Sequence, residues 1–392
     1  MVPEHLADNQ ETETPCGGFS FIIGSAVRRM HRRGRDRLPP ESPIRKVLIY
    51  RLGSLGDTVA ALPCFHLIAR SFPEAERVLL TNFPVHAKAA ASAAVLGDSG
   101  LIHGTMRYTV GTRRIGELVR LAWEIRRFRP DVLVYLMPLR PWNQVRRDRI
   151  FFRLAGVRRI VGLPSEADMK RRYDSATGLY EAEAVRLERT IAELGQAHAE
   201  DLANWDLRLN AAEKNAAAQV LAPMQGMRLL VCAPGCKMQA NDWEQENWRE
   251  LLGRLYRRYS PYGLVMAGGK EDAALCAYAA QDWAGAKLNL AGRLGPRESA
   301  AVFAQADVFI GPDSGPKHLA ACMGVPCVCA FGARNLPGVW FPPGTRNQIV
   351  HHPPECSGCG LETCIAMEKK CIRSVTVEEM EQAVERVLGR AG

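Results

Sequence analysis

The fold of this chain is decided by Val308-Phe-Ile-Gly-Pro-Asp-Ser-Gly-Pro-Lys-His-Leu-Ala320, an apolar run followed at once by small and polar residues. The apolar run predicts a buried strand, and the residues after it predict a sharp turn that opens a helix through Lys317–Leu319. A helix start presents unpaired backbone N–H groups and the positive end of the helix dipole, which together suit a phosphate group. Asp313 adds an acceptor beside that site, and His318 adds a donor whose protonation can switch.

A second turn of the same kind, Arg51-Leu-Gly-Ser-Leu-Gly-Asp-Thr58, lies far upstream. It follows Lys46–Tyr50, a continuous apolar run that predicts a strand buried on both faces, and it precedes helical periodicity over 57–71. In doubly wound sheets, ligands bind at the carboxyl ends of the strands. Both turns are therefore expected at a binding edge.

The whole chain alternates between strands and helices, which predicts an α/β fold with parallel sheets. Further strands are expected at 78–81, 132–137, 229–233, 264–267 and 327–331, with helices at 115–128, 244–259, 271–283, 296–305 and 314–323. A last helix should start with a capping box of Thr376 and Glu379. The pattern restarts after residue 210, so we expect a basic, flexible appendage at 1–43 and two Rossmann-like doubly wound domains at 44–210 and 211–392.

Composition limits the class of protein. With 392 residues, 47% of them hydrophobic and 24% charged, the chain has a globular composition without an apolar run long enough to span a bilayer. Twelve cysteines, several of them in strand-like runs, suit a reducing cytosol better than a disulfide framework. A cytoplasmic location is therefore expected.

Charge is uneven along the chain. Residues 1–210 hold 32 Lys and Arg against 24 Asp and Glu, whereas residues 211–392 hold 19 against 18. A basic first half suggests an anionic substrate or surface, although solvated arginine would give the same pattern. The arginine cluster Arg28–Arg37 would either rest on an anionic membrane or belong to a disordered tail. With 7% aromatic residues and no nucleic-acid-binding motif, nucleic acid is not expected as a partner.

Together these residues resemble a known family. Arg51–Pro63 is similar to the N-terminal signature of glycosyltransferase family 9, the bacterial heptosyltransferases of lipopolysaccharide core assembly, and Asp313–Pro326 is similar to its C-terminal signature. Pro234-Gly-Cys-Lys-Met, followed by Trp243, resembles the first strand-end motif of the family's donor domain. The resemblance runs from about residue 45 to the C-terminus. It implies a GT-B architecture, in which two Rossmann-like domains face each other across a cleft.

The resemblance also implies a reaction: an inverting, metal-independent transfer of a heptose from ADP-heptose to an anionic glycolipid or oligosaccharide acceptor at the inner face of the inner membrane. Asp57 then matches the proposed general base, which takes the acceptor's proton. The same position would suit a helix cap. Gly53, Ser54 and Gly56 would lie on the acceptor side, where Arg113 and Arg114 could attract an anionic acceptor, as could Arg146 and Arg147.

On the donor side, the resemblance assigns the diphosphate to the turn at Ser314 and Gly315 and to His318, beside Asp313. Glu271 matches a carboxylate that binds ribose hydroxyls, although it would equally suit a helix start. The chain departs from the family at Asn241-Asp-Trp243, where many members have Lys-Arg-Trp. Lys237 could replace the missing lysine.

Four cysteines, Cys356, Cys359, Cys364 and Cys371, follow each other within sixteen residues. Such thiols would either hold a structural zinc ion or remain free or redox-active. No cofactor or catalytic metal is expected to be required.

The sequence lacks the signatures of two other nucleotide-binding classes. The first turn lacks the GxGxxG of dinucleotide-dependent oxidoreductases, and the chain has no GxxxxGK[ST] of Walker-type NTPases. A hydrolysing nucleotide-sugar epimerase of GT-B fold stays open, as does a non-catalytic assembly factor that keeps the donor site.

Overall fold

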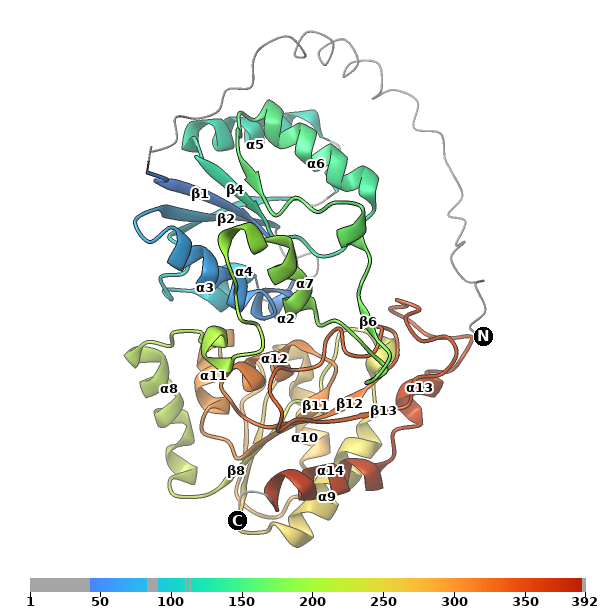
Figure 1. The fold of residues 1–392 in the computed structure, drawn as a ribbon. Helices are drawn as coiled ribbons and strands as arrows, with labels where there is room; N and C mark the ends of the chain where they lie inside the picture. The colour runs from blue at the N-terminus through green and yellow to red at the C-terminus, as the bar shows by residue number, and fades with distance from the viewer. Residues whose placement is uncertain (1–42, 83–90, 110, 113, 390–392) are drawn as a thin grey trace, which may run out of the picture. The chain divides into compact units, whose positions relative to one another are not determined.

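The computed structural model describes residues 43–82, 91–109, 111–112 and 114–389, which build two parallel sheets (Figure 1). The first sheet has the strand order β3-β2-β1-β4-β5 and the second the order β10-β9-β8-β11-β12-β13. The strands of the first are β1 (Lys46–Tyr50), β2 (Glu76–Asn82), β3 (Gly104–Tyr108), β4 (Val132–Tyr135) and β5 (Ile160–Val161). Those of the second are β8 (Leu229–Cys232), β9 (Gly263–Met266), β10 (Lys287–Asn289), β11 (Val308–Pro312), β12 (Cys327–Phe331) and β13 (Gln348–His351). A short antiparallel hairpin pairs β6 (Tyr173–Asp174) with β7 (Leu179–Tyr180).

Helices connect the strands, as parallel pairing requires. Those in the first half are α2 (Leu55–Val59), α3 (Leu62–Ser71), α4 (Ser92–Leu96), α5 (Ile115–Phe128), α6 (Trp142–Leu154) and α7 (Glu183–Thr190). Those in the second half are α8 (Ala211–Leu221), α9 (Gln245–Arg258), α10 (Ala273–Ala279), α11 (Pro296–Phe303), α12 (Gly315–Cys322), α13 (Lys370–Arg373) and α14 (Val377–Leu388). The predicted capping box of the last helix is confirmed, because Glu379 accepts hydrogen bonds from Thr376 N and Oγ1.

One prediction is wrong in detail. The expected single helix over 57–71 is two helices, α2 and α3, with Pro63 in the first turn of the second. Proline has no backbone N–H and its ring clashes with the preceding turn, so it starts a helix readily and does not continue one.

Alternate residues of each strand face opposite sides of a sheet, and both sides of the first sheet are covered. Val47 and Ile49 of β1 pack in the cluster that includes α3 and α7, whereas Leu48 and Tyr50 pack in the cluster that includes α5 and α6. Figure 1 shows α5 and α6 together on one side of this sheet and α3 and α7 on the other.

The second sheet is covered in the same way, by α9, α10 and α14 on one face and by α8, α11 and α12 on the other. Its second face shares one hydrophobic cluster with the first sheet, which holds both Val47 and Val231. Residues 44–392 accordingly form one compact unit. The predicted boundary between 210 and 211 stays a prediction. Within the described part of the chain, no helix has the length and apolarity to cross a membrane.

Candidate functional site

The turn between β1 and α2 carries the first predicted site residues. Gly53 has a φ of +140°, and a Cβ there would lie 2.3 Å from the Cβ of Asp57, so the turn requires glycine. Asp57 Oδ2 accepts hydrogen bonds from Ser54 N at 2.8 Å and from Ser54 Oγ at 3.0 Å. Ser54 is thus the N-cap residue of α2, and Asp57, at the third helical position, completes a capping box with it instead of being the N-cap itself. Its side chain is still 24% exposed, which leaves the carboxylate within reach of a substrate.

Arg51 fixes this turn from behind. It is fully buried and donates from Nη2 to the Asp57 carbonyl oxygen at 2.6 Å, and Nη2 lies 3.9 Å from Asp57 Oδ1. Its Nη1 lies 3.8 Å from Glu183 Oε1, and Glu183 also pairs with Arg171 and Arg186 at 2.8 Å. Burial raises the pKa of Glu183, but these three guanidinium groups lower it by more, so this carboxylate stays charged.

The turn between β11 and α12 carries the second set. Lys317 and His318 are almost completely buried, and Lys317 Nζ lies 2.5 Å from Asp313 Oδ1 and 3.0 Å from His318 Nε2. An ammonium group can donate hydrogen bonds but cannot accept them, so Nε2 of His318 is the acceptor and the ring proton belongs on Nδ1. Burial lowers the pKa of His318 well below its ordinary value, and the charge of Lys317 lowers it further. His318 is therefore a neutral imidazole that carries its proton on Nδ1.

Two buried polar groups at the start of α12 have unsatisfied hydrogen-bonding capacity. His318 Nδ1 and Ser314 Oγ are buried, and neither has a hydrogen-bond partner among the described residues. They are four positions apart, so they lie on one side of the first turn of α12. Buried donors are normally satisfied, and an anion at the helix start would satisfy both.

The two turns meet, although they belong to different sheets. A Cβ on Gly56 would lie 3.1 Å from His318 Cδ2, and a Cβ on Gly315 would lie 3.0 Å from Leu55 Cδ2. The helix starts therefore approach through their glycines. The sequence predicted a binding role for each turn, and the structure brings the two into contact.

The charge of Lys237 is influenced by two of the other predicted site residues. Partial burial lowers the pKa of Lys237, and the negative charges of Glu271 and Asp57 oppose that shift. Glu271 is exposed, and the carboxylate that caps its short helix belongs to Asp272, which accepts from Gly269 N at 2.8 Å. Glu271 itself lies in the first turn of the short helix Lys270–Asp272, as the helix-start alternative allowed, but the capping hydrogen bond is made by Asp272.

Asp313 is held by internal contacts. Its Oδ2 accepts from Asn335 at 3.3 Å, and its backbone oxygen accepts from Asn241 Nδ2 at 3.2 Å, in addition to the pair with Lys317. Its carboxylate therefore orders the turn. The sequence analysis assigned no role to Lys317. Its place beside a histidine at a predicted helix start could have indicated that it belongs to the site. Asn241, where a lysine was expected, lies against the same aspartate.

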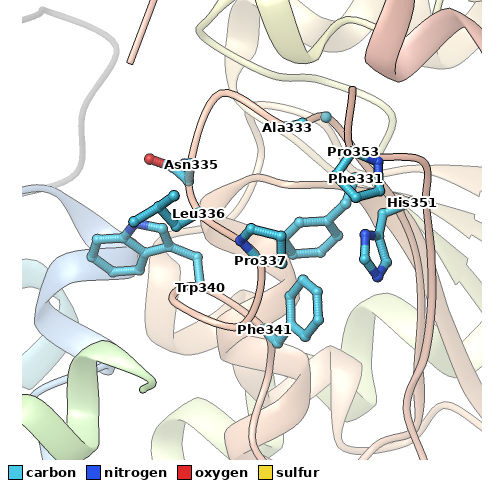
Figure 2. A pocket seen from close by; sticks show the side chains of 10 residues that line it. Phe331, Ala333, Asn335, Leu336, Pro337, Trp340, Phe341, His351 and Pro353 are labelled. Atoms are coloured by element: carbon cyan, nitrogen blue, oxygen red, sulfur yellow. The ribbon is translucent and has the colours of Figure 1, made fainter. Parts of the chain in front are cut away.

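An aromatic pocket adjoins this cluster. Figure 2 shows Phe331, Trp340, Phe341 and His351 around it. Asn335 links the pocket to Asp313, and the Trp340 ring contacts the His318 ring edge-to-face at 6.0 Å. Apolar surface thus lies directly beside the orphaned polar groups.

The remaining predicted residues lie elsewhere. Arg114 is the N-cap residue of α5, is exposed and pairs with Glu117 at 3.6 Å. Arg113 lies outside the described residues, as do residues 1–42 with Arg28–Arg37.

The four clustered cysteines, Cys356, Cys359, Cys364 and Cys371, are all free. Burial raises the pKa of Cys356 and the other three thiols raise it further, so they are neighbours, but no three His, Cys, Asp or Glu side chains in the described ranges converge on a metal position. The four thiols thus do not fit a zinc site as they stand.

Comparison with known proteins identifies the family. The model of glycosyltransferase family 9 (heptosyltransferase) matches residues 166–370, just over half of the chain. The chain belongs to glycosyltransferase family 9. The match includes the α12 turn, Lys237 and Glu271, whereas the Arg51–Asp57 turn lies before it.

Relatives of this family 9 member support the assignment. Lipopolysaccharide heptosyltransferase 3 of Escherichia coli is 28% identical over 127 residues, which are 32% of this chain and 36% of that protein. The chain thus matches about a third of the length of this curated relative.

Solved structures agree on the fold. A family 9 glycosyltransferase of Veillonella parvula has a TM-score of 0.66 at 16% identity, with 89% of this chain and 99% of that chain covered. ADP-heptose lipopolysaccharide heptosyltransferase II of E. coli has a TM-score of 0.63 at 17% identity, with 88% and 100% covered. The GT-B architecture with two Rossmann-like domains is therefore confirmed.

Proposed function

We propose that this family 9 member transfers a heptose or related sugar from a nucleotide-diphosphate donor, ADP-heptose, to a lipopolysaccharide core or related glycan acceptor, with inversion and without a metal ion. The contact between the two turns carries the proposal, because it brings the helix start that contains Asp57 against the start of α12. A solved relative, heptosyltransferase WaaC of E. coli, has been captured with ADP and with ADP-2-deoxy-2-fluoro heptose.

The first step assigned to these residues is proton removal. The acceptor hydroxyl loses its proton to the Asp57 carboxylate while its oxygen attacks the anomeric carbon of the donor. Oδ2 of Asp57 is engaged by Ser54, so Oδ1, which faces Arg51, is the freer oxygen. Attack from the side opposite the diphosphate inverts the anomeric centre.

The second part is stabilisation of the leaving group. The bond from the anomeric carbon to the phosphate oxygen breaks, and the diphosphate departs with the electron pair. The N–H groups at the start of α12, Ser314 Oγ–H and His318 Nδ1–H would meet that charge, together with the ammonium group of Lys237. Glu271 would accept hydrogen bonds from the ribose, and the pocket beside Trp340 would offer apolar surface to the rest of the donor.

Release of ADP by the purified full-length chain tests this function. We expect ADP release from ADP-heptose to require a core-oligosaccharide acceptor, and UDP release from UDP-glucose to stay at background with the same acceptor. Equal release without acceptor would indicate a hydrolase or epimerase instead. Binding of ADP without any release, in the presence of acceptors, would indicate a non-catalytic assembly factor.

A further inference from the structure

A row of apolar side chains lies in water on the outer face of α5. Ile115, Val119 and Trp123 are 67%, 61% and 58% exposed, and their spacing of four residues places them on one side of the helix. The opposite side of α5 buries Leu121, Ile125 and Phe128 in the core. Folding has thus left large apolar side chains exposed on a helix that already has a well-packed inner face.

The neighbouring helix α6 has the same character. Trp142, Ile150 and Leu154 are exposed at positions that share its outer side, whereas Val145 and Phe152 are buried. Arg126 of α5 donates to the carbonyl oxygen of Leu154 at 2.6 Å, which ties the two helices together. Both helices pack on the same face of the first sheet, so their outer sides point away from it in the same direction (Figure 1).

Arginines surround this apolar row. The two helices carry seven exposed arginines and three acidic residues, and the arginines are Arg120, Arg126, Arg127, Arg146, Arg147, Arg149 and Arg153. Of the acids, Asp148 is buried against Arg140 and Tyr135, while Glu117 and Glu124 pair with arginines of their own helix. The guanidinium group of Arg127 lies over the Trp123 ring at 5.4 Å.

We infer that the outer face of α5 and α6, called here the arginine–tryptophan face, docks on an anionic lipid bilayer. Apolar side chains with tryptophan would enter the interface between headgroups and acyl chains, and the arginines would meet the lipid phosphates. Nucleic acid would satisfy the arginines but would leave Ile115, Val119 and Leu154 in water. A second copy of the chain would set one arginine-rich surface against another, with few free carboxylates to pair them.

The position of the arginine–tryptophan face is consistent with the proposed function, and this one part of the inference rests on that function. In a parallel sheet with crossover helices, each helix begins at the carboxyl edge of the strands. Ile115 and Trp142 therefore lie toward the edge at which the Arg51–Asp57 turn leaves β1. An acceptor anchored in the docked bilayer would present its headgroup to that edge.

Sedimentation of the full-length chain with vesicles tests the docking. We expect binding to vesicles of phosphatidylcholine with 30% phosphatidylglycerol, and little binding to phosphatidylcholine alone. Replacing Ile115, Val119 and Trp123 together by serine should weaken the partition coefficient roughly tenfold or more, since three apolar anchors are lost. Arg126→Gln with Arg127→Gln should weaken it about fivefold for each charge. Matched controls in the second half, Ile365→Ser and Arg257→Gln, change equally exposed residues and should bind like the wild type.

A second readout distinguishes insertion from charge attraction alone. Lipids brominated on the acyl chain should quench part of the tryptophan fluorescence of the bound protein, and Trp123→Phe should bind as well but lose part of that quenching. Vesicle binding that is unchanged in both face variants would overturn the inference and place the contact in another part of the chain, such as Arg28–Arg37. So would a wild-type dimer that the serine variant dissociates, because the face would then belong to a second copy. Neither result depends on sugar transfer, so the docking can fail while the proposed function stands.

Discussion

Replacement of Asp57 by asparagine and by alanine would separate its two roles. The structure gives this carboxylate two hydrogen bonds from Ser54 at the start of α2, at 2.8 and 3.0 Å. Asparagine keeps an oxygen that can accept those bonds but cannot take up the acceptor's proton. Alanine loses both abilities.

The two roles predict effects of different size on two different quantities, the free energy of unfolding and the turnover. Loss of a capping side chain costs about 0.5–2 kcal/mol of the free energy of unfolding. Loss of a general base costs about 100-fold or more in turnover. We therefore expect Asp57→Asn to unfold within about 1 kcal/mol of the wild type and to lose turnover strongly. Asp57→Ala should lose turnover equally and unfold more easily than Asp57→Asn. Urea unfolding and acceptor-dependent ADP release measure the two effects.

The last helix offers a matched control. Glu379 accepts from Thr376 N at 2.9 Å and from Thr376 Oγ1 at 3.0 Å, the same pattern that Asp57 makes with Ser54. Glu379→Ala should cost stability without lowering the turnover of the folded protein. If Asp57→Asn keeps more than about a third of wild-type turnover, Asp57 is a helix cap and the base must be sought elsewhere.

Further predictions concern the donor side. Lys237→Ala should weaken ADP binding by ~1.5–3 kcal/mol, as measured by calorimetry, while adenosine binding and the control Lys214→Ala stay unchanged; equal ADP affinity would remove Lys237 from the site. Because the pKa of His318 is depressed in the fold, the unfolded state takes up a proton first as pH falls below about 6.5, and the free energy of unfolding should fall by up to ~1.4 kcal/mol per pH unit. His318→Gln should flatten that slope in urea titrations at pH 7.5, 6.5 and 5.5; an identical slope would contradict the buried neutral ring. Lys317→Met should lower the free energy of unfolding by ~3–5 kcal/mol because it removes the only cation paired with Asp313 among the described residues, and adding Asp313→Asn should restore part of that loss; additive losses would show that the pair is uncoupled. Turnover in excess EDTA should equal turnover without it, and a fall restored by one metal would establish metal dependence.

The sequence was sufficient to predict the fold and the positions of both strand-to-helix turns. Apolar runs such as Lys46–Tyr50 and Cys327–Phe331 are buried on both faces, so they differ sharply from the helices around them. β10, with the pattern Lys287-Leu-Asn289, and β3, with Gly104-Thr-Met-Arg-Tyr108, have mixed polarity because they lie at sheet edges, and neither was predicted. Helix α6 was missed as well, since its exposed apolar residues blur the helical period.

Contacts between residues distant in sequence could not be predicted. Nothing in the spacing of Gly56 and His318 indicates that they touch, because this contact depends on how two separate sheets pack. The internal role of Asp313 was hidden for the same reason, since Asn241 and Asn335 reach it from other loops. The four cysteines show the opposite case, in which close spacing in sequence did not produce a converged set of ligands.

Under the proposed function, the arrangement around Asp313 limits which groups could bind the donor diphosphate. Lys317 is buried and its charge is matched by Asp313, and His318 is kept neutral by its burial and by that same lysine. Neither side chain therefore brings net positive charge to the start of α12; that turn offers oriented N–H and O–H dipoles instead. Lys237 is exposed, so under the proposed function it is the side chain that would bring a positive charge to the incoming phosphate.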